Sequence, residues 1–130
     1  MTTQQRPLSP HLQVYRWQIT MLMSIAHRAS GVLLSIGALG LVGWLLALAA
    51  GSATYEQWRV MASSLPGQIV LFALSAALVY HLLNGLRHLL WDTGRALDIV
   101  DVYRTGYTVW MLTIVLTAGI WYAALSGGAA

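Results

Sequence analysis

The chain has 130 residues, of which 58% are hydrophobic and only 8% are charged. Soluble domains carry about 25% charged residues, so this composition excludes an ordinary soluble protein and indicates one membrane domain, residues 1–130. The net charge of +3 comes from arginines, and the absence of cysteine excludes disulfides, iron–sulfur ligation by this chain and thiol catalysis.

The N-terminal segment, residues 1–26, is predicted to be cytoplasmic or interfacial. Its motif Arg6-Pro-Leu-Ser-Pro-His-Leu-Gln-Val-Tyr-Arg16 contains two prolines, which favour an extended or turned start. The segment lacks the apolar block of a secretory signal peptide and the serine- and arginine-rich amphipathic pattern of a mitochondrial transit peptide. These features favour a bacterial inner membrane over the mitochondrial inner membrane.

Three charge-free runs predict transmembrane helices near residues 27–50, 68–91 and 106–126. A helix needs about 20 apolar residues to cross the hydrocarbon core, and each run is longer than that. The predicted fold is therefore all-α, an antiparallel up-down bundle of three membrane-spanning helices that a partner subunit completes. Between the first two spans, Thr54 and Gln57 predict a capping box for a short interfacial helix, and residues 63–67 predict a chain break.

The arginines predict the orientation of the chain in the membrane. Every arginine except Arg59 lies before the first predicted span or around the second loop, residues 92–104. The positive-inside rule then places the N-terminus and this loop in the cytoplasm and the C-terminus outside. This placement relates the basic charge to a lipid bilayer and not to nucleic acid.

Two polar stripes interrupt the apolar helices. They are Ser24-x-x-His27-Arg28-x-x-Gly31 and His81-x-x-Asn84-Gly85-x-x-His88-x-x-x-Asp92. At 100° per residue, each set falls on one helix face in a stripe about 100° wide. Ionisable side chains inside membrane helices are costly and normally face a cofactor, a cavity or a partner, so the stripes predict a buried imidazole site.

His81 is the candidate metal ligand, because it lies about 15 Å from the inner end of its span, near the membrane middle. Zinc needs three or four close ligands, and His88 is two helical turns away from His81. A haem iron needs one axial histidine per side and accepts the second from another chain. Gly85, four residues on, leaves room for a planar group. The cationic side chains nearer the cytoplasm would then meet the propionates: His27, Arg28 and His88. The alternative is an interhelical hydrogen bond from His81 to a serine or a backbone carbonyl.

Ser24 and Arg28 share a helix face at the cytoplasmic end of the first span. A hydroxyl and a guanidinium together can bind a carbonyl oxygen and stabilise the charge that develops on it. Alternatively, Arg28 extends its charge to lipid headgroups. Asp92, at the inner end of the second span, is either a counter-ion for Arg28 or a helix-end charge that faces water.

The N-terminal motif and both stripes closely resemble the cytochrome b membrane-anchor subunit of succinate dehydrogenase (respiratory complex II). The similarity covers nearly the whole chain, with the motifs in order and at the spacing of the family. Val14, Ser30 and Leu86 stand where the family often has isoleucine, threonine and isoleucine. None of these differences removes a polar group.

The resemblance implies a role for each stripe residue. His81 matches the axial ligand of haem b, whose second ligand comes from a second small membrane-anchor subunit. His27 and His88 lie beside the haem propionates, Ser24 and Arg28 match quinone-pocket residues, and Asp92 matches an acid near the quinone arginine. FAD and iron–sulfur clusters belong to separate flavoprotein and iron–sulfur subunits, so the chain is not catalytic alone.

Three other interpretations remain open on the sequence. A quinol:fumarate reductase anchor runs the reverse reaction, and sequence does not fix direction. A small transporter or channel subunit would use the polar stripes as a proton path, and a structural anchor would have lost its haem. Both of the latter predict that the purified complex has no haem absorption.

Overall fold

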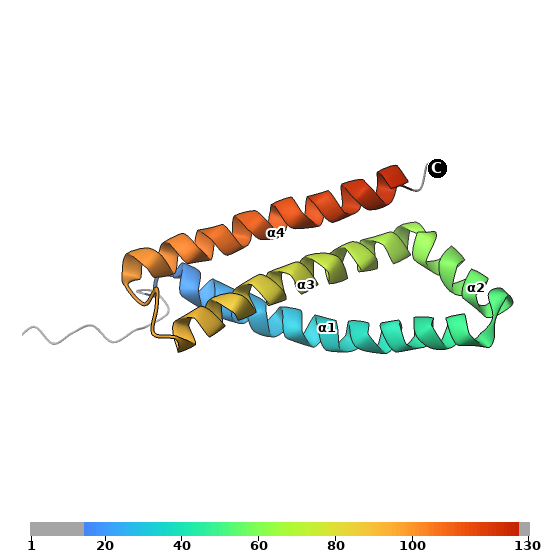
Figure 1. Ribbon diagram of the computed structural model, residues 1–130, viewed down its shortest axis with the longest axis horizontal. Helices are drawn as coiled ribbons and strands as arrows, with labels where there is room; N and C mark the ends of the chain where they lie inside the picture. The colour runs from blue at the N-terminus through green and yellow to red at the C-terminus, as the bar shows by residue number, and fades with distance from the viewer. Residues whose placement is uncertain (1–14, 128–130) are drawn as a thin grey trace, which may run out of the picture.

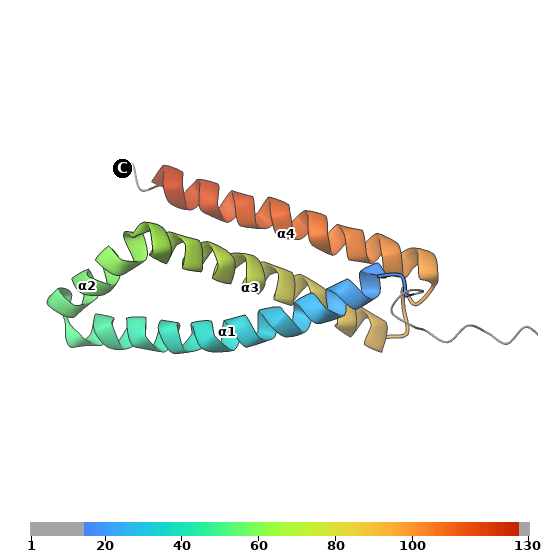
Figure 2. The same cartoon turned by 180° about the vertical axis from the view of Figure 1, so that it is seen from behind.

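The computed structural model describes residues 15–127 and arranges them in four helices (Figure 1). The helices are α1 (Ile19–Ala50), α2 (Ser52–Ser63), α3 (Leu65–Asp92) and α4 (Ile99–Gly127). Most of the N-terminal motif, from Arg6 to Val14, lies outside the described residues. Figure 2 shows the same arrangement from behind, with α2 joining α1 to α3 at the end opposite the α3–α4 loop.

Three of these helices are long and apolar enough to cross a membrane. α1, α3 and α4 contain 32, 28 and 29 residues, with mean hydropathies of 2.3, 1.9 and 1.7 over their most apolar windows. Their outward faces are apolar as well, since Leu39 is 74% exposed and Met111 is 67% exposed. Such surfaces must face lipid or a partner helix. The prediction of an all-α protein with three membrane spans is therefore confirmed.

Two helices extend beyond the predicted membrane spans. α1 starts at Ile19, so residues 19–26, which were expected to be interfacial, extend the first helix, and α4 starts at Ile99 instead of near 106. The predicted spans begin near charged residues such as Arg28. Charge does not end a helix when a long arginine side chain can reach the interface from a helical backbone.

The α1–α3 connection contains the short helix α2. Its N-cap is Gly51, with a φ of 109° and no side-chain capping bond, so the predicted capping box at Thr54 and Gln57 is wrong. The left-handed backbone that glycine allows at this turn starts the helix two residues before Thr54. The predicted break is confirmed at Ser64, whose hydroxyl caps α3 by accepting a hydrogen bond from the Gly67 amide at 3.2 Å.

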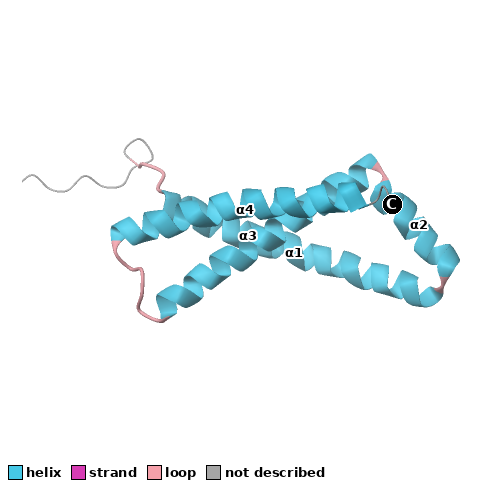
Figure 3. Ribbon diagram, turned by 45° about the horizontal axis from the view of Figure 1, so that its top comes forward, coloured by secondary structure: helices cyan, strands magenta, loops and turns pink. Residues whose placement is uncertain are grey.

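α3 lies at the centre of the bundle and packs against both α1 and α4. α1 and α3 cross (Figure 3), so the two helices approach closely only over part of their length. Met23, Tyr80 and Val109 form the small apolar core near this crossing. The Tyr80 hydroxyl donates a 2.8 Å hydrogen bond to the Met23 carbonyl, which fixes α3 against α1.

Candidate functional site

The crossing of α1 and α3 brings three histidines together. The His27 ring stacks on the His81 ring, with 4.0 Å between centroids and 10° between planes. The His88 ring lies 5.4 Å from His27 and makes an edge contact with Trp91 at 5.1 Å. The two stripes, 54 residues apart between His27 and His81, thus meet as one imidazole cluster because α1 and α3 cross at these turns.

A serine fixes the His81 imidazole. The Ser30 hydroxyl lies 3.0 Å from His81 Nδ1 and 2.8 Å from the His27 carbonyl oxygen. A serine has one proton, which it donates to the carbonyl because a carbonyl only accepts. Ser30 therefore accepts from His81 Nδ1–H, and the Nε2 lone pair of His81 is the one left free to bind a metal.

The two stripe glycines have different surroundings. A Cβ atom on Gly31 would lie 3.2 Å from His81 Cε1, so this glycine lets the imidazole approach the α1 backbone. A Cβ atom on Gly85 would have no neighbour within 4 Å. The side of α3 that carries Gly85 is therefore open beside the histidines, as a planar ligand requires.

Among the described residues, four buried side-chain atoms have no hydrogen-bond partner: three belong to His27 and Asn84 of the two stripes, and the fourth is Thr117 Oγ1 of α4. His27 Nδ1 and both amide atoms of Asn84 are buried without a partner among the described residues. Asn84 is 0% exposed. Its position in the second stripe is visible in the sequence, but only the packing reveals that it faces the protein interior.

Ser24, Arg28 and Asp92 all lie on exposed surface near the same end of the bundle. Arg28 Nε donates to the Ser24 backbone carbonyl at 3.4 Å, so these two residues lie next to each other on α1. Within residues 15–127, no ion pair joins Arg28 to Asp92. The Ser24 and Arg28 polar groups therefore point outward from this chain, where another subunit or a ligand can reach them.

Arg87 is a charged residue that the sequence analysis did not single out. It is only 5% exposed, and it donates from Nε to Thr105 Oγ1 at 2.9 Å and from one terminal nitrogen to the Val102 carbonyl at 2.7 Å. Its guanidinium lies 4.0 Å from the centroid of the Trp91 ring. In the sequence, the feature that could have pointed to Arg87 is its position one residue before His88, beside the second stripe.

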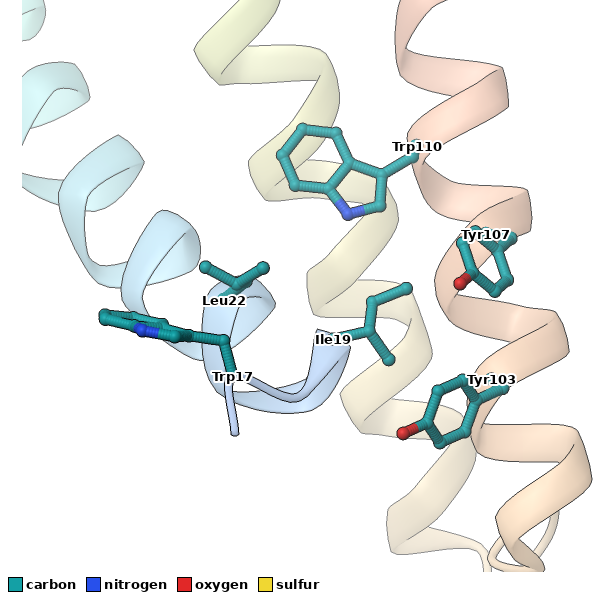
Figure 4. Close-up of a pocket in the computed structure, with 6 residues that line it drawn as sticks. All are labelled: Trp17, Ile19, Leu22, Tyr103, Tyr107 and Trp110. Carbon is teal, nitrogen blue, oxygen red and sulfur yellow. The ribbon is translucent and has the colours of Figure 1, made fainter. Parts of the chain in front are cut away.

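An aromatic groove of about 540 Å³ lies between the start of α1 and the N-terminal half of α4. Its lining residues are Trp17, Ile19, Leu22, Tyr103, Tyr107 and Trp110 (Figure 4). Amphipathic aromatic rings of this kind concentrate at membrane–water interfaces. The groove lies at the end of the bundle that carries Ser24 and Asp92.

The described residues offer no cluster of three or more histidine, cysteine, aspartate or glutamate side chains placed for one metal ion. A zinc site built by this chain alone is therefore not supported by the described residues. A prosthetic group that takes a single imidazole from each of two chains agrees with the arrangement around His81.

Comparisons with known proteins give one consistent result. The family model described as "Succinate dehydrogenase/Fumarate reductase transmembrane subunit" matches residues 2–120. The succinate dehydrogenase cytochrome b560 subunit of human mitochondria is 41% identical over 120 residues, which cover 88% of this chain and 69% of the relative. The succinate dehydrogenase cytochrome b556 subunit of Rickettsia prowazekii is 42% identical over 116 residues, covering 89% and 90%.

Proposed function

Because this chain belongs to the succinate dehydrogenase/fumarate reductase transmembrane subunit family, we propose that it is the cytochrome b membrane anchor of a succinate:quinone oxidoreductase. In this role the chain anchors a flavoprotein subunit and an iron–sulfur subunit to the bilayer, together with a second small anchor subunit. Succinate is oxidised on the flavoprotein, and quinone is reduced at the membrane. The chain is not catalytic alone, since it has no cysteine to hold a cluster.

His81 is the proposed axial ligand of a haem b shared with the partner anchor. Ser30 makes the interhelical hydrogen bond to a serine that is the alternative to haem, but this bond occupies only His81 Nδ1. No hydrogen bond within the described residues uses His81 Nε2, and this free nitrogen is the observation that carries the assignment. The open side of α3 at Gly85 supports it as well. His27, Arg28 and His88 hold the propionates from the cytoplasmic side. When bound, the haem supplies a one-electron carrier near the quinone site.

The quinone head group is proposed to bind at Ser24 and Arg28. Their neighbouring, outward-facing polar groups support a shared pocket with another subunit. The hydroxyl and guanidinium hydrogen-bond one carbonyl oxygen of quinone and stabilise the negative charge that forms on reduction. Asp92, on the same end of the bundle, is proposed to act as the acid near this pocket.

A reduced-minus-oxidised spectrum of the purified complex, with its subunits identified by mass, tests the proposed function. We expect a b-type haem spectrum together with succinate-driven quinone reduction. A complex that reduces quinone without haem would support the structural-anchor alternative, and one with neither property would support a transporter subunit. Faster fumarate reduction by quinol than succinate oxidation by quinone would favour the fumarate reductase anchor.

Ser30→Ala is expected to weaken haem binding without abolishing it. Removing the hydroxyl leaves His81 Nδ1–H unpaired and the ring free to change tautomer, and losing such a partner typically costs 10- to 100-fold in metal affinity. The amount of haem per complex, measured as the pyridine haemochrome after detergent washing, should therefore be lower than in the wild-type complex. Ser30→Thr keeps the hydroxyl and should retain haem. If the alanine and threonine variants behave alike, the hydrogen bond has no role in haem binding.

The proposed location is a bacterial inner membrane with the N-terminus in the cytoplasm. The N-terminal part of α1, which contains Arg28, and the C-terminal part of α3, which contains Arg87, lie at the same end of the bundle as the α3–α4 loop (Figure 1), and this supports the orientation. A periplasmic reporter enzyme fused after Ser126 should be active, and the same reporter inserted after Gly94 should be inactive. The reverse pattern would mean that the chain has the opposite orientation in the membrane. Activity at neither site would mean that α4 does not cross the membrane, which would contradict three spans.

A further inference from the structure

Within the described part of the chain, the buried guanidinium of Arg87 has no negative partner. Within residues 15–127, the ion pairs are Glu56–Arg59 and Asp101–Arg104, and neither includes Arg87. An arginine side chain stays charged and has five N–H donors, of which the hydrogen bonds to Thr105 and Val102 use two. Arg87 is therefore a buried cation with donors left for an acceptor.

Arg87 forms part of the wall of a groove between α3 and α4. The groove has a volume of about 250 Å³, and two threonines, Thr105 and Thr108, line it beside Arg87. Five aliphatic side chains form the rest of its lining: Leu83, Leu86, Leu90, Val109 and Leu112. A single cationic group within a mainly aliphatic groove matches a molecule with one charged group and a hydrocarbon chain.

The depth of the groove matches the boundary between headgroups and hydrocarbon. Arg87 is five residues from the end of α3 at Asp92, so it lies about 7.5 Å inside that end. The 28 residues of α3 make it about 42 Å long, close to the full thickness of a bilayer with its headgroups. Arg87 therefore lies roughly 13 Å from the middle, where the hydrocarbon core ends.

The groove opens on the side of α3 away from the histidines. At 100° per residue, Leu83, Leu86 and Leu90 lie about opposite to His81 on the helix. Leu86 and Leu90 are 53% and 36% exposed, so this face is uncovered in the chain. In the proposed function the partner anchor approaches from the histidine side, which leaves this groove to lipid.

We propose that the groove binds one anionic phospholipid of the leaflet on the side of the α3–α4 loop. Its phosphate accepts hydrogen bonds from the unused donors of Arg87, and one acyl chain lies along the leucines of α3 and α4. An anionic lipid is favoured over a zwitterionic one because Arg87 carries a charge that no described carboxylate compensates. The inference that the groove faces lipid rests on the proposed function. The burial of the Arg87 cation and the residues that line the groove do not depend on that function.

Native mass spectrometry of the delipidated complex, titrated with phosphatidylglycerol or phosphatidylcholine in micelles, tests this proposal. We expect one phosphatidylglycerol per complex, bound about fivefold more tightly than phosphatidylcholine, since the choline ammonium of the latter offsets the phosphate charge that the Arg87 guanidinium attracts. Addition of inorganic phosphate should not displace it, because phosphate has no chain for the aliphatic lining. Equal binding of both lipids, or displacement by phosphate, would overturn the proposal.

Three variants locate the lipid. Leu86→Trp fills the groove and leaves Arg87 in place, and it should remove the bound phosphatidylglycerol while haem content and quinone reduction stay normal. Arg87→Gln should also lose the preference for the anionic lipid. Arg104→Gln removes an exposed cation of the same loop end and should retain binding. Retention of the lipid by Leu86→Trp, or a partner side chain seated in the groove in a density map, would refute the site. A haem-free wild-type complex would instead contradict the proposed function.

Discussion

Replacing His81 with alanine is expected to remove haem b from the purified complex. His81 is the histidine nearest the middle of the span, about 16 Å from the end of α3, and Ser30 holds its ring with Nε2 free. Loss of a partner that only orients a ligand costs 10- to 100-fold in affinity, so loss of the axial ligand itself should cost more than about 100-fold. Haem per complex, measured by pyridine haemochrome, should approach zero.

His88→Ala is the matched control on the same helix. His88 is exposed and lies two turns closer to the end of α3, where it contacts Trp91. Its removal should alter the haem midpoint potential, through a lost propionate contact, while most of the haem remains. If His88→Ala loses haem and His81→Ala keeps it, the assignment of the axial ligand by depth and by the Ser30 contact is wrong.

Arg28→Ala is expected to lower the rate of quinone reduction by about ten- to a hundred-fold. That range corresponds to the roughly 1.5–3 kcal/mol that a hydrogen bond to a charged group contributes. Oxidation of succinate with a soluble acceptor that takes electrons before the membrane should stay nearly normal, because this step does not reach the anchor. The two rates are measured on the same preparation of the complex.

Two further variants separate the quinone role from a general effect of charge. Ser24→Ala should lower quinone reduction more mildly than Arg28→Ala, because a neutral hydroxyl contributes less than a guanidinium. Arg95→Ala removes an exposed arginine of the α3–α4 loop and should leave the rate unchanged. A normal rate of quinone reduction in Arg28→Ala would mean that Arg28 does not bind quinone and instead contacts a haem propionate or lipid headgroups. Equal losses in the Arg28 and Arg95 variants would point to surface charge alone.

The sequence by itself determined the three spans and the composition of the two stripes. Hydropathy and helical periodicity depend on each residue and its near neighbours, so α1, α3 and α4 follow from local composition. The helix starts were less well determined, because Arg28 and Arg104 look like boundaries in a charge pattern but remain inside helices. The capping box at Thr54 failed for a similar reason, since Gly51 can end one helix and start the next.

Only the tertiary structure decided which atoms of the stripes meet. The Ser30 contact with His81 joins residues 51 positions apart, and no local pattern distinguishes it from a serine that bonds only its own helix. The same holds for Arg87, whose burial depends on Thr105 and Val102 of α4. Side chains on one helix face share a direction, but their partners depend on how α1 and α3 cross and how α4 packs. Crossing angles arise from packing along the whole interface, which a periodic pattern in one helix does not contain.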